Sequence, residues 1–380
     1  MQHDVIVIGG GIVGTATAAH VAATGRSVLL VERATLGAGA SGRNSGVVQH
    51  PFDPVMVELY RETLGLYRAL TTRSGGTFTL PERPAGMLMA AFDADVAQAL
   101  TRDVEVAMPE LEPTFLGPGE VTAMEPAFHE DVAACRLDIA FPVEPLAATR
   151  AYADDARRAG ARLREGAAAR PVVQYGRVHG VELVEAGTSD GIRIAAETVV
   201  VAAGPWTPAL LDPTGTWRPI EPLWGVVIDA LLAAPPGHVV EEVWTGVTPG
   251  DEHPDHAFSL VTAGGRSSVG SAFLTEEPDV AAVAASILER AQRFVPSVGV
   301  ASIGATRVCA RPLSQDERPL VGAVPGVDGL YVAAGHGPWG ISTGPAAATL
   351  LTDLIEGRRA APPPALDPAR FGPIPVAGRA

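Results

Sequence analysis

The apolar residues of the first thirty positions follow the pattern of a strand, a helix and a second strand. Val5–Ile8 is a short run of apolar, β-branched residues, which is typical of a buried parallel strand. Thr15–Ala23 is rich in small residues and predicts a helix that Gly25 ends. Ser27–Val31 predicts a second buried strand. The pattern therefore indicates a parallel sheet near the start of the chain.

Three glycines connect the first strand to the helix in the spacing G-x-G-x-x-G. Gly9 permits a tight turn, Gly11 lets a pyrophosphate approach the backbone, and Gly14 lets the helix pack closely on the strand. The free N–H groups at the start of the helix attract phosphate. Glu32 ends the second strand, where an acid accepts hydrogen bonds from both ribose hydroxyls and disfavours a 2′-phosphate. The unit predicts a dinucleotide site for FAD or NAD, and NADP is disfavoured.

Beyond this unit the pattern changes between helical and strand-like spacing. Helices are predicted over Val55–Leu70, Ala90–Asp103, Pro145–Gly160, Val280–Phe294 and Ser342–Glu356. Strands are predicted over Pro81–Met89, Ala161–Glu165, Arg170–Val184 with a turn at Tyr175–Gly176, Thr198–Ala202, Ala305–Pro312 and Asp328–Ala334. Alternating segments at Ile220–Ala230, Val239–Thr245, Ala257–Thr262 and Ser267–Gly270 predict an antiparallel sheet. Pro109–Pro126 predicts a surface excursion.

Length and composition restrict the class of protein. A chain of 380 residues favours two domains, and 47% apolar residues supply ample core. The net charge of −15 argues against nucleic acid or an anionic membrane as partner. All 28 basic residues are arginines, so no lysine is present to form a Schiff base. Two cysteines, no signal-like segment and no apolar run long enough to span a bilayer lead us to expect a soluble, cytoplasmic protein without a metal site.

Two segments rich in small residues are candidates for contact with the dinucleotide. Gly37–Gly46 has many backbone N–H groups and hydroxyls to place against a ligand, although a flexible connection has the same composition. The strand Thr198–Ala202 is followed by Ala203 and Gly204, which let the backbone come close to a nucleotide.

The order of these segments resembles the D-amino-acid-oxidase-like family of FAD-dependent oxidoreductases, which includes glycine and sarcosine oxidases. The matching stretches are VIVIGGGIVG with Glu32, GASGRNSGVV, VVVAAGPW and ERPLVGAVPGVDGLYVAAGHGPWGISTGP. The resemblance covers nearly the whole chain and implies FAD as cofactor. It also implies an α/β fold of two domains, in which a Rossmann-like FAD-binding domain carries an inserted, antiparallel substrate domain. The FAD-binding domain is expected over 1–50, 144–219 and 303–358, the substrate-binding domain over 51–143 and 220–302, and an extended tail over 359–380.

In this family the last matching stretch runs under the flavin. A helix dipole and free amides from Gly340 to Thr343 would stabilise negative charge near flavin N1 and the C2 carbonyl. His336 would add a hydrogen bond there, or is a structural loop residue. The expected cofactor-binding residues are Gly9, Gly11, Ile12, Val13, Gly14, Glu32, Arg33, Ser41, Arg43, Asn44, Ser45, Gly46, Val172, Val173, Ala203, Gly204, Trp206, Cys309, Gly335, His336, Gly337, Trp339, Gly340 and Ile341.

Two residues in the stretch RVCARP are singled out by the resemblance. Arg311 sits where the glycine-oxidase pattern L-R-P carries its carboxylate-binding arginine, and a bidentate pair would orient an amino acid on the flavin. An ion pair with Asp316 is the alternative. Cys309 sits where sarcosine oxidases bond a cysteine to the flavin 8α-methyl, and Arg307 would lower its pKa. A small buried apolar role for Cys309 is favoured over that bond; Cys135 is expected to be structural.

The substrate side of the flavin is expected to be lined by residues from several segments. Gln49 and His50 follow the glycine-rich loop, with His50 either a catalytic base or structural. Trp339 is expected to pack on the substrate, and Trp224 is either a pocket wall or a core residue. Sarcosine-type oxidases place a lysine near flavin N5, whereas this chain offers only Arg266 nearby. A quinone or carrier protein is therefore an alternative to oxygen as electron acceptor.

The sequence predicts an enzyme that oxidises the CH–NH bond of a small amino acid or N-substituted amino acid. Hydride would pass from the α-carbon to flavin N5, and the imine would hydrolyse. Arg311, His336 and His50 are the candidate catalytic residues. One alternative is an FAD-dependent 2-hydroxy-acid dehydrogenase, which needs a base for CH–OH oxidation. Another is an FAD-bearing electron-transfer subunit of a larger complex.

Overall fold

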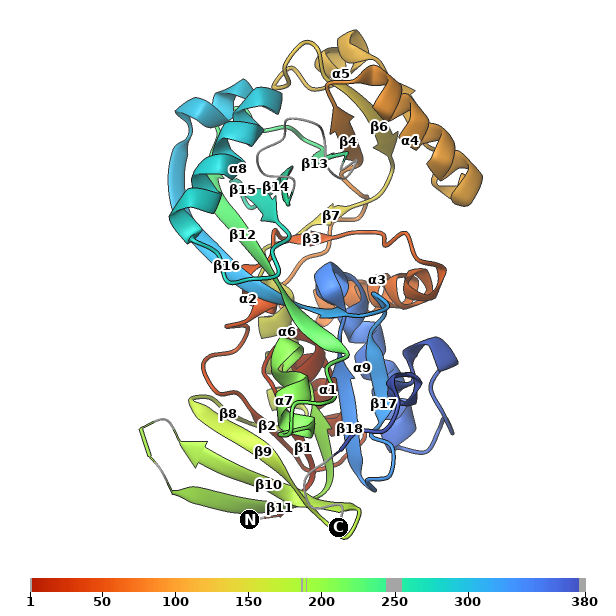
Figure 1. The fold of residues 1–380 in the computed structure, drawn as a ribbon, viewed down its shortest axis with the longest axis vertical. Coiled ribbons are helices and arrows are strands. Elements are labelled where there is room, and N and C mark those ends of the chain that lie inside the picture. Colours follow the sequence, from red (N-terminus) through yellow and green to blue (C-terminus); the bar gives the residue numbers. More distant parts are fainter. Residues whose placement is uncertain (1, 186, 189, 244–254, 376–380) are drawn as a thin grey trace.

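The computed structural model describes residues 2–185, 187–188, 190–243 and 255–375. These residues form two stacked bodies, each built around one large sheet (Figure 1). We refer to the sheets as the first sheet, which contains the N-terminal strand, and the second sheet. The α/β prediction with two sheet-based units is therefore confirmed.

The first sheet is mainly parallel. Its strand order is β17-β18-β11-β1-β2-β8, and β10 and β9 extend from β11 as antiparallel neighbours. The strands are β1 (Gln2–Ile8), β2 (Val28–Val31), β8 (Arg162–Arg164), β9 (Ala167–Gln174), β10 (Arg177–Glu185), β11 (Gly191–Val201), β17 (Leu320–Ala323) and β18 (Leu330–Ala334). Segments far apart in the sequence thus complete one sheet, as predicted.

Both faces of β1 are buried, which explains its continuous apolar sequence. Val5 and Val7 belong to the core beneath α1 (Ile12–Ala22), α6 (Ala147–Arg158) and α9 (Gly340–Ile355). Ile6 and Ile8 belong to the core on the opposite face, together with residues of β9 and β10. A strand covered on both sides needs apolar residues at every position rather than at alternate ones.

The second sheet has the order β16-β12-β15-β14-β13-β4-β6-β5. Its strands are β4 (Met87–Ala91), β5 (Thr114–Leu116), β6 (Ala133–Leu137), β12 (Ile220–Leu231), β13 (Val239–Glu242), β14 (His256–Ala263), β15 (Arg266–Ala272) and β16 (Ser302–Ser314). The four segments predicted to form an antiparallel sheet do so, as β12–β15, β15–β14 and β14–β13. The sheet also contains one parallel pair that was not predicted, between β13 and β4. These two strands come from separate insertions, so no hairpin sets their relative direction. Thr245, in the predicted strand Val239–Thr245, lies outside the described residues.

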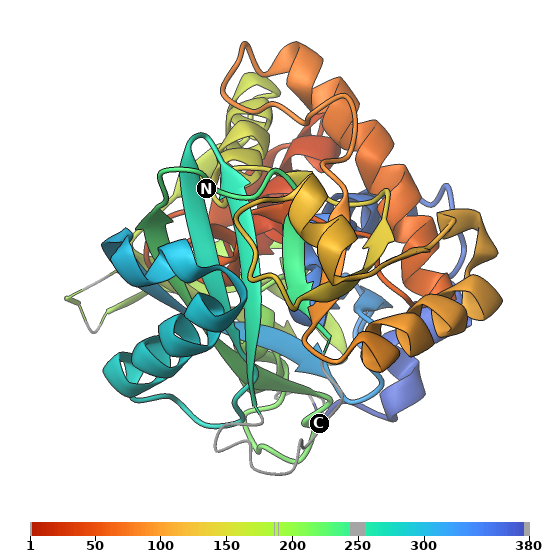
Figure 2. The ribbon, with the colours of Figure 1, turned by 90° about the horizontal axis from the view of Figure 1, so that it is seen from above.

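Helices cover the second sheet at two places. α8 (Val280–Phe294) has the predicted bounds and packs on Val226 and Ile228 of β12. Seen from above, α8 and α4 (Ala94–Ala107) lie on opposite sides of the second body (Figure 2). The segment Pro109–Pro126 is more ordered than predicted, since it contains η1 (Pro109–Leu111), the edge strand β5 and α5 (Pro118–Met124).

Strand β16 pairs with β12 over most of its length and is therefore part of the second sheet. The expected FAD-binding segment 303–358 begins inside this strand, so its first residues share a sheet with the expected substrate domain. The pairing extends from Ser302 to Ser314, after which the chain enters the first body through β17. The division of the chain into two functional domains stays a prediction, with β16 as the strand that connects them.

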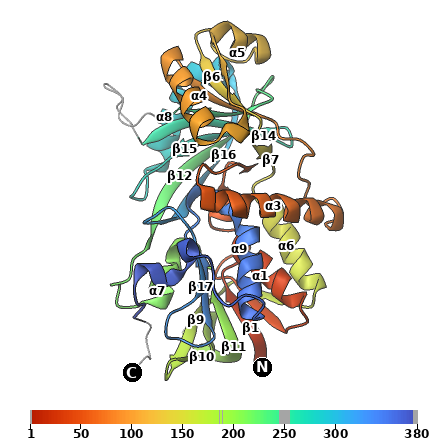
Figure 3. The same cartoon turned by 90° about the vertical axis from the view of Figure 1, so that its right-hand side faces the viewer.

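Short elements join the two bodies. Helix α3 (Pro54–Arg73) lies across the boundary between them (Figure 3). β3 (Val47–Val48) and β7 (Phe141–Pro142) form a two-stranded ribbon beside it. The remaining elements are α2 (Ala40–Arg43), α7 (Thr207–Leu211), η2 (Gly204–Trp206), η3 (Pro296–Val300), η4 (Gly337–Trp339), η5 (Pro364–Leu366) and η6 (Pro368–Phe371).

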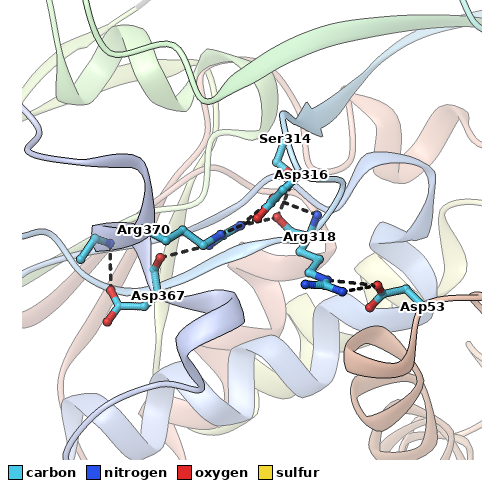
Figure 4. Close-up of polar contacts among 7 residues, drawn as sticks. Asp53, Ser314, Asp316, Arg318, Asp367 and Arg370 are labelled. Carbon is cyan, nitrogen blue, oxygen red and sulfur yellow. Dashed lines mark hydrogen bonds and ion pairs between the residues drawn. The ribbon is translucent and has the colours of Figure 1, made fainter.

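The described part of the C-terminal segment is folded onto the first body, so the prediction of an extended tail is wrong for residues 359–375. Leu366 and Ile374 are buried, so their apolar contacts hold this Pro-rich segment against the core of the first body. Arg370 donates to both carboxylate oxygens of Asp316, at 2.7 and 3.0 Å, and to the Arg318 carbonyl (Figure 4). Residues 376–380 lie outside the described residues.

The same network reaches the start of α3. Asp53 accepts hydrogen bonds from the Val55 and Met56 N–H groups through one oxygen. Its other oxygen accepts from the Arg318 guanidinium (Figure 4). Burial raises the pKa of Asp53, but the bonds from Arg318, Met56 and Val55 outweigh it and lower the pKa. The carboxylate therefore caps α3 and fixes it to the turn before β17.

We predict that Asp53→Ala lowers the free energy of unfolding by about 2 kcal/mol at pH 7, because it removes a helix cap and an ion pair. Asp93→Ala is the matched control, since Asp93 caps α4 by accepting from the Asp95 N–H without an ion pair to a distant segment. Its expected loss is about 1 kcal/mol. A carboxylate with a lowered pKa stabilises the native state above its unfolded pKa of about 4, so the D53A deficit shrinks at lower pH. Urea titrations would contradict this if both variants lost equal stability.

Candidate active site

The turn between β1 and α1 has no room for side chains. Gly9 has a φ of +114°, and a Cβ there would overlap the Ala202 carbonyl oxygen at the end of β11. A Cβ on Gly14 would overlap the Gly9 carbonyl oxygen, and one on Gly11 would lie 2.9 Å from Ser41 Oγ. Gly9 and Gly14 are therefore required by close approach of the backbone, and Gly11 by the side chain of Ser41. Such close approach is the condition for a phosphate-binding turn.

The N-terminus of α1 is open to an anion. Its N-cap residue, Gly11, has no side chain that could accept hydrogen bonds from the first N–H groups of the helix. The first turn also contains no acidic residue. The Ile12 N–H donates to Ser41 Oγ at 2.9 Å, which brings the glycine-rich loop over the helix start. The helix dipole and these N–H groups fit the diphosphate of a dinucleotide.

Glu32 lies beside the same turn. Its carboxylate accepts from the Gly10 N–H at 2.7 Å and from the Ala34 N–H at 2.9 Å. The carboxylate is thus held at the end of β2, as a ribose-binding acid must be. The Arg33 guanidinium lies 4.0 Å from the ring centroid of Trp206, so η2 and the end of β2 share one surface. That Ala203, Gly204 and Trp206 bind the cofactor stays a prediction.

The structure places Val172 and Val173 away from Glu32. The Ala167 N–H donates to the Glu32 carbonyl, and β9 then runs about 16 Å from Ala167 to Val172. Val173 pairs with Val178, which in turn bonds to Asp328 before β18. The residues of β9 beside the predicted ribose site are therefore those around Ala167, which sequence inspection missed because the strand's start was set three residues too late.

The loop after β2 is fixed by Asn44. Its amide donates to the carbonyls of Ala40 and Ser41, and its Oδ1 accepts from the Gly46 N–H. Gly46, with a φ of +84°, leaves no room for a Cβ beside the Val143 carbonyl. Arg43 donates to the Val308 carbonyl at 3.1 Å. Asn44 therefore shapes the loop, while Arg43 attaches it to β16; Ser45, between Asn44 and Gly46, is half-buried.

Helix α9 presents a second uncapped N-terminus. Neither a capping side chain nor an acid occupies its first turn. The Ile341 carbonyl receives no helical hydrogen bond, because Pro345 has no N–H group. The buried Tyr67 hydroxyl donates to this carbonyl instead, at 2.8 Å. The Gln49 N–H donates to Ser342 Oγ at 2.9 Å. Residues 340–343 are therefore held from both α3 and the β3 segment, with their backbone amides at the helix start.

His336 precedes this helix and is almost completely buried, at 1% exposure. Its Nδ1 lies 2.8 Å from Thr343 Oγ1, whose own hydrogen is donated to the Trp339 carbonyl. Nδ1 must therefore carry the proton, which leaves Nε2 as an acceptor, buried and without a partner among the described residues. Burial lowers the pKa of His336 to about 4, so the ring is neutral at pH 7. A neutral acceptor fits a hydroxyl of the cofactor better than its C2 carbonyl.

Arg311 is buried at 9% exposure and is fixed by neutral groups. It donates to the Ala272 carbonyl at 2.8 Å and to Ser271 Oγ at 2.5 Å, and its guanidinium lies 4.9 Å from the Phe273 ring. The alternative ion pair with Asp316 is ruled out, because Asp316 bonds to Arg370. Among the described residues no carboxylate lies within ion-pair distance of Arg311, so the site fits an external carboxylate.

Glu241 of β13 is a site residue that sequence inspection missed. Gln49 Nε2 donates to its Oε2 at 3.1 Å. Burial raises the pKa of Glu241, opposed by Gln49 and by the charge of Arg311. Burial likewise lowers the pKa of Arg311, opposed by Cys309 and Glu241. The sequence VVEE could have indicated this residue. Side chains alternate along a strand, so two adjacent acidic residues project from opposite faces of the sheet and one of them must point inward.

Two predicted substrate-side residues point elsewhere. His50 packs against Tyr60 and Phe52, with ring centroids 5.2 and 6.0 Å away, and not beside Arg311. Trp224 pairs with Ala310, so it projects from the face of the sheet opposite to Arg311. The structure therefore gives no support to His50 as a base or to Trp224 as a pocket wall. Arg266 is the exposed first residue of β15, where it pairs with Ala263 of β14.

Cys309 shares the Arg311 face of β16 but is an unreactive thiol in this environment. It is 3% exposed, and burial raises its pKa despite the charges of Arg311, Arg43 and Arg307. Arg307 is paired with Asp229 at 2.7 Å. A covalent bond to the cofactor is therefore not favoured by the thiol's ionisation.

A separate cleft of about 600 Å³ lies between β7 and the β14–β15 turn. Phe78, Glu144 and Gly264 are among its lining residues, and none of the predicted site residues lines it. Size alone does not make it the reactive site, since the fixed Arg311 and the two open helix N-termini lie elsewhere.

Comparison with known proteins identifies the cofactor that these helix termini accommodate. The model of a family described as FAD dependent oxidoreductase matches residues 4–354. A glycine oxidase of Geobacillus kaustophilus is 27% identical over 95% of this chain and 94% of its own length. A glycine oxidase of Pseudomonas aeruginosa is 30% identical over 98% of this chain and 99% of its own. The solved glycine oxidase of G. kaustophilus superposes with a TM-score of 0.80, at 26% identity, over 99% of this chain and all of the other.

FAD is thus the cofactor, and the residues fit it. The glycine turn and the start of α1 would hold the diphosphate, Glu32 the ribose, and the start of α9 the flavin's electronegative edge. Among the described residues no helix is both long and apolar enough to cross a bilayer.

We predict that Glu32→Gln weakens FAD binding by about tenfold to a hundredfold, because a charged acceptor at the ribose becomes a neutral amide. Glu165→Gln is the matched control, since Glu165 accepts from the Leu36 N–H in the same region but is exposed. FAD titration of the apoprotein, followed by flavin fluorescence, measures both. Equal dissociation constants for E32Q and wild type would contradict the role of Glu32.

The buried His336 gives a second prediction. Its folded pKa of about 4 lies below the unfolded value of 6.5, so the unfolded chain binds more protons as the pH falls from 6.5 to 4. The native state therefore loses stability over this window, by up to about 3 kcal/mol from this residue. Urea unfolding at pH 7, 6 and 5 should show a flatter pH dependence for His336→Asn than for wild type. Parallel curves would show that His336 is not buried as a neutral ring.

Proposed function

The chain belongs to the family of FAD-dependent oxidoreductases, and on that premise we propose that it oxidises the CH–NH bond of a small amino acid or N-substituted amino acid. The observation that carries the proposal is Arg311, which is buried, held at both Nη atoms by neutral groups, and without a carboxylate partner among the described residues. A fixed guanidinium with no acid beside it is costly unless an anion binds there. The carboxylate of an amino acid supplies that anion.

The surrounding residues support binding and orientation. Ser271 and Ala272 prevent the Arg311 guanidinium from rotating, so a bound carboxylate fixes the position of its α-carbon. Gln49 connects the first turn of α9 to the second sheet and thus sets the distance between the two halves of the site. Bound FAD would supply the acceptor for a hydride from that α-carbon. The amides of residues 340–343 then stabilise negative charge at the helix start.

The 2-hydroxy-acid alternative loses its expected base. It needs a side chain that removes a hydroxyl proton, and the candidates were histidines. His50 lies in an aromatic cluster, and His336 is buried with a strongly lowered pKa. The arrangement therefore favours amine oxidation, in which the neutral amine needs no histidine base.

The test is anaerobic mixing of the purified holoenzyme with glycine and with D-, L- and N-methyl amino acids and 2-hydroxy acids, while flavin absorbance is recorded. We expect bleaching by small amino or N-methyl amino acids and none by 2-hydroxy acids. For Arg311→Lys we expect kcat/KM to fall at least about a hundredfold with FAD still bound, because a lysine cannot replace a bidentate guanidinium.

Arg307→Lys is the control, since Arg307 projects from the same face four residues earlier but is paired with Asp229 and Ser268. It should keep kcat/KM within a few-fold of wild type. Bleaching by 2-hydroxy acids alone would replace this function with the alternative, and an unchanged R311K would remove Arg311 from the site.

A further inference from the structure

We propose that Glu241 binds the amino group of the substrate, so that Arg311 and Glu241 together receive the two charged ends of an amino acid. The proposal rests on the proposed function and deepens it, because it names the residue that recognises the nitrogen. It draws on strand register, on the small residues between the two side chains, and on how each is held.

Strand register places Glu241 and Arg311 on one face of the second sheet. Glu241 pairs with Ser259, and Ser259 pairs with Gly270. Gly270 pairs with Val227 of β12, two residues from Gly225. Gly225 pairs with Cys309, two residues before Arg311 on β16. Paired residues share a face, and so do residues two apart along a strand, so the whole series projects in one direction.

The residues between them are small, which leaves the space above the sheet to the two long side chains. A Cβ on Gly225 would overlap the Arg311 guanidinium, so Arg311 lies directly over β12. It reaches Ser271 and Ala272 of β15. A Cβ on Gly270 would lie 3.0 Å from Ser259 Oγ, which is the next side chain towards Glu241. Arg311 therefore extends across the sheet towards β13.

The two charges act on each other without touching. Each shifts the pKa of the other, yet among the described residues no ion pair joins them. Each is held instead by neutral groups: Arg311 by Ser271 and Ala272, and Glu241 by Gln49. Arg311 is buried and Glu241 is half-buried, so opposite charges kept apart in this way are each short of a charged partner. A zwitterion between them satisfies both, its carboxylate towards Arg311 and its ammonium or amine towards Glu241.

Gln49 fixes which part of the site receives the nitrogen. Its side chain donates to Glu241, and its backbone N–H donates to Ser342 in the first turn of α9. Glu241 is thus positioned relative to the helix start that the flavin edge requires. A 2-hydroxy acid or a plain carboxylate would leave Glu241 without a cationic partner, so this acid selects against them.

The chain supplies a matched control in Glu242. As the next residue in β13 it projects from the opposite face, where its carboxylate accepts from Arg290 at 2.6 and 2.9 Å and from the Phe258 N–H. Glu242→Gln therefore removes an equal charge, one residue away, without altering the face that carries Arg311.

The test uses two ligands of nearly equal shape that the enzyme cannot oxidise. 2-Aminoisobutyrate lacks an α-hydrogen, and 2,2-dimethylpropanoate replaces its ammonium by a methyl group. Their affinities for the holoenzyme are measured from shifts in the flavin spectrum. We expect wild type and E242Q to prefer the amino ligand. In Glu241→Gln its affinity should fall at least about tenfold while that of the dimethyl ligand does not fall, and R311K should weaken both.

An E241Q protein with the wild-type preference would overturn the proposal. If E241Q fails to retain FAD, wild type alone decides: equal affinity for the two ligands overturns the proposal, and a preference for the amino ligand supports it. The proposed function fails separately, when no amino acid bleaches the flavin and neither ligand binds. If amino acids bleach the flavin but the enzyme shows no preference for 2-aminoisobutyrate over 2,2-dimethylpropanoate, only the role of Glu241 is contradicted.

Discussion

The close approach of the β1–α1 turn to the end of β11 is the constraint on which the rest of the structure depends. Gly9 touches the backbone at Ala202, and Gly14 touches Gly9, so the start of α1 can lie only where the two parallel strands end. That geometry opens the helix N-terminus to a diphosphate and leaves Glu32 at the edge of the same turn. Carboxyl ends of parallel strands are where α/β sheets bind ligands.

The second half of the site depends on how the two bodies are joined. β12 and β16 carry the second sheet, and the chain returns from β16 into the first sheet at β17. Tyr67 and Gln49 fix the start of α9 from the opposite side. Because these contacts come from segments that precede and follow the second sheet, the helix start and the Arg311 face are held as one unit rather than as two hinged parts.

The charged side chains of the second sheet differ in whether their partners are charged or neutral. Arg311 is buried and Glu241 half-buried, and both are bonded to neutral groups, whereas Arg307 and Glu242 form ion pairs. Arg307 and Glu242 are thus neutralised by partners inside the protein, and it is on the contrast with Arg311 and Glu241 that the proposed recognition of a zwitterion rests. His336 adds a neutral acceptor rather than a third charge.

The sequence by itself determined the features that depend on neighbours along the chain. It predicted the β1–α1–β2 unit with its glycines and Glu32, and helix α8 to the residue. Arg311 became a candidate only through the resemblance to a known family. Only the tertiary structure decided which strands pair and which face each side chain occupies. The pairing of β9 places Val172 and Val173 away from Glu32. The registers of β12 and β13 place Trp224 on the face of the second sheet opposite to Arg311 and Glu241 on the same face as Arg311. Side chains along a strand alternate between the two faces of the sheet, so a shift of one residue in the pairing moves every side chain to the other face. Which residues meet therefore depends on pairings between segments that are distant in the sequence, and no local pattern specifies these pairings.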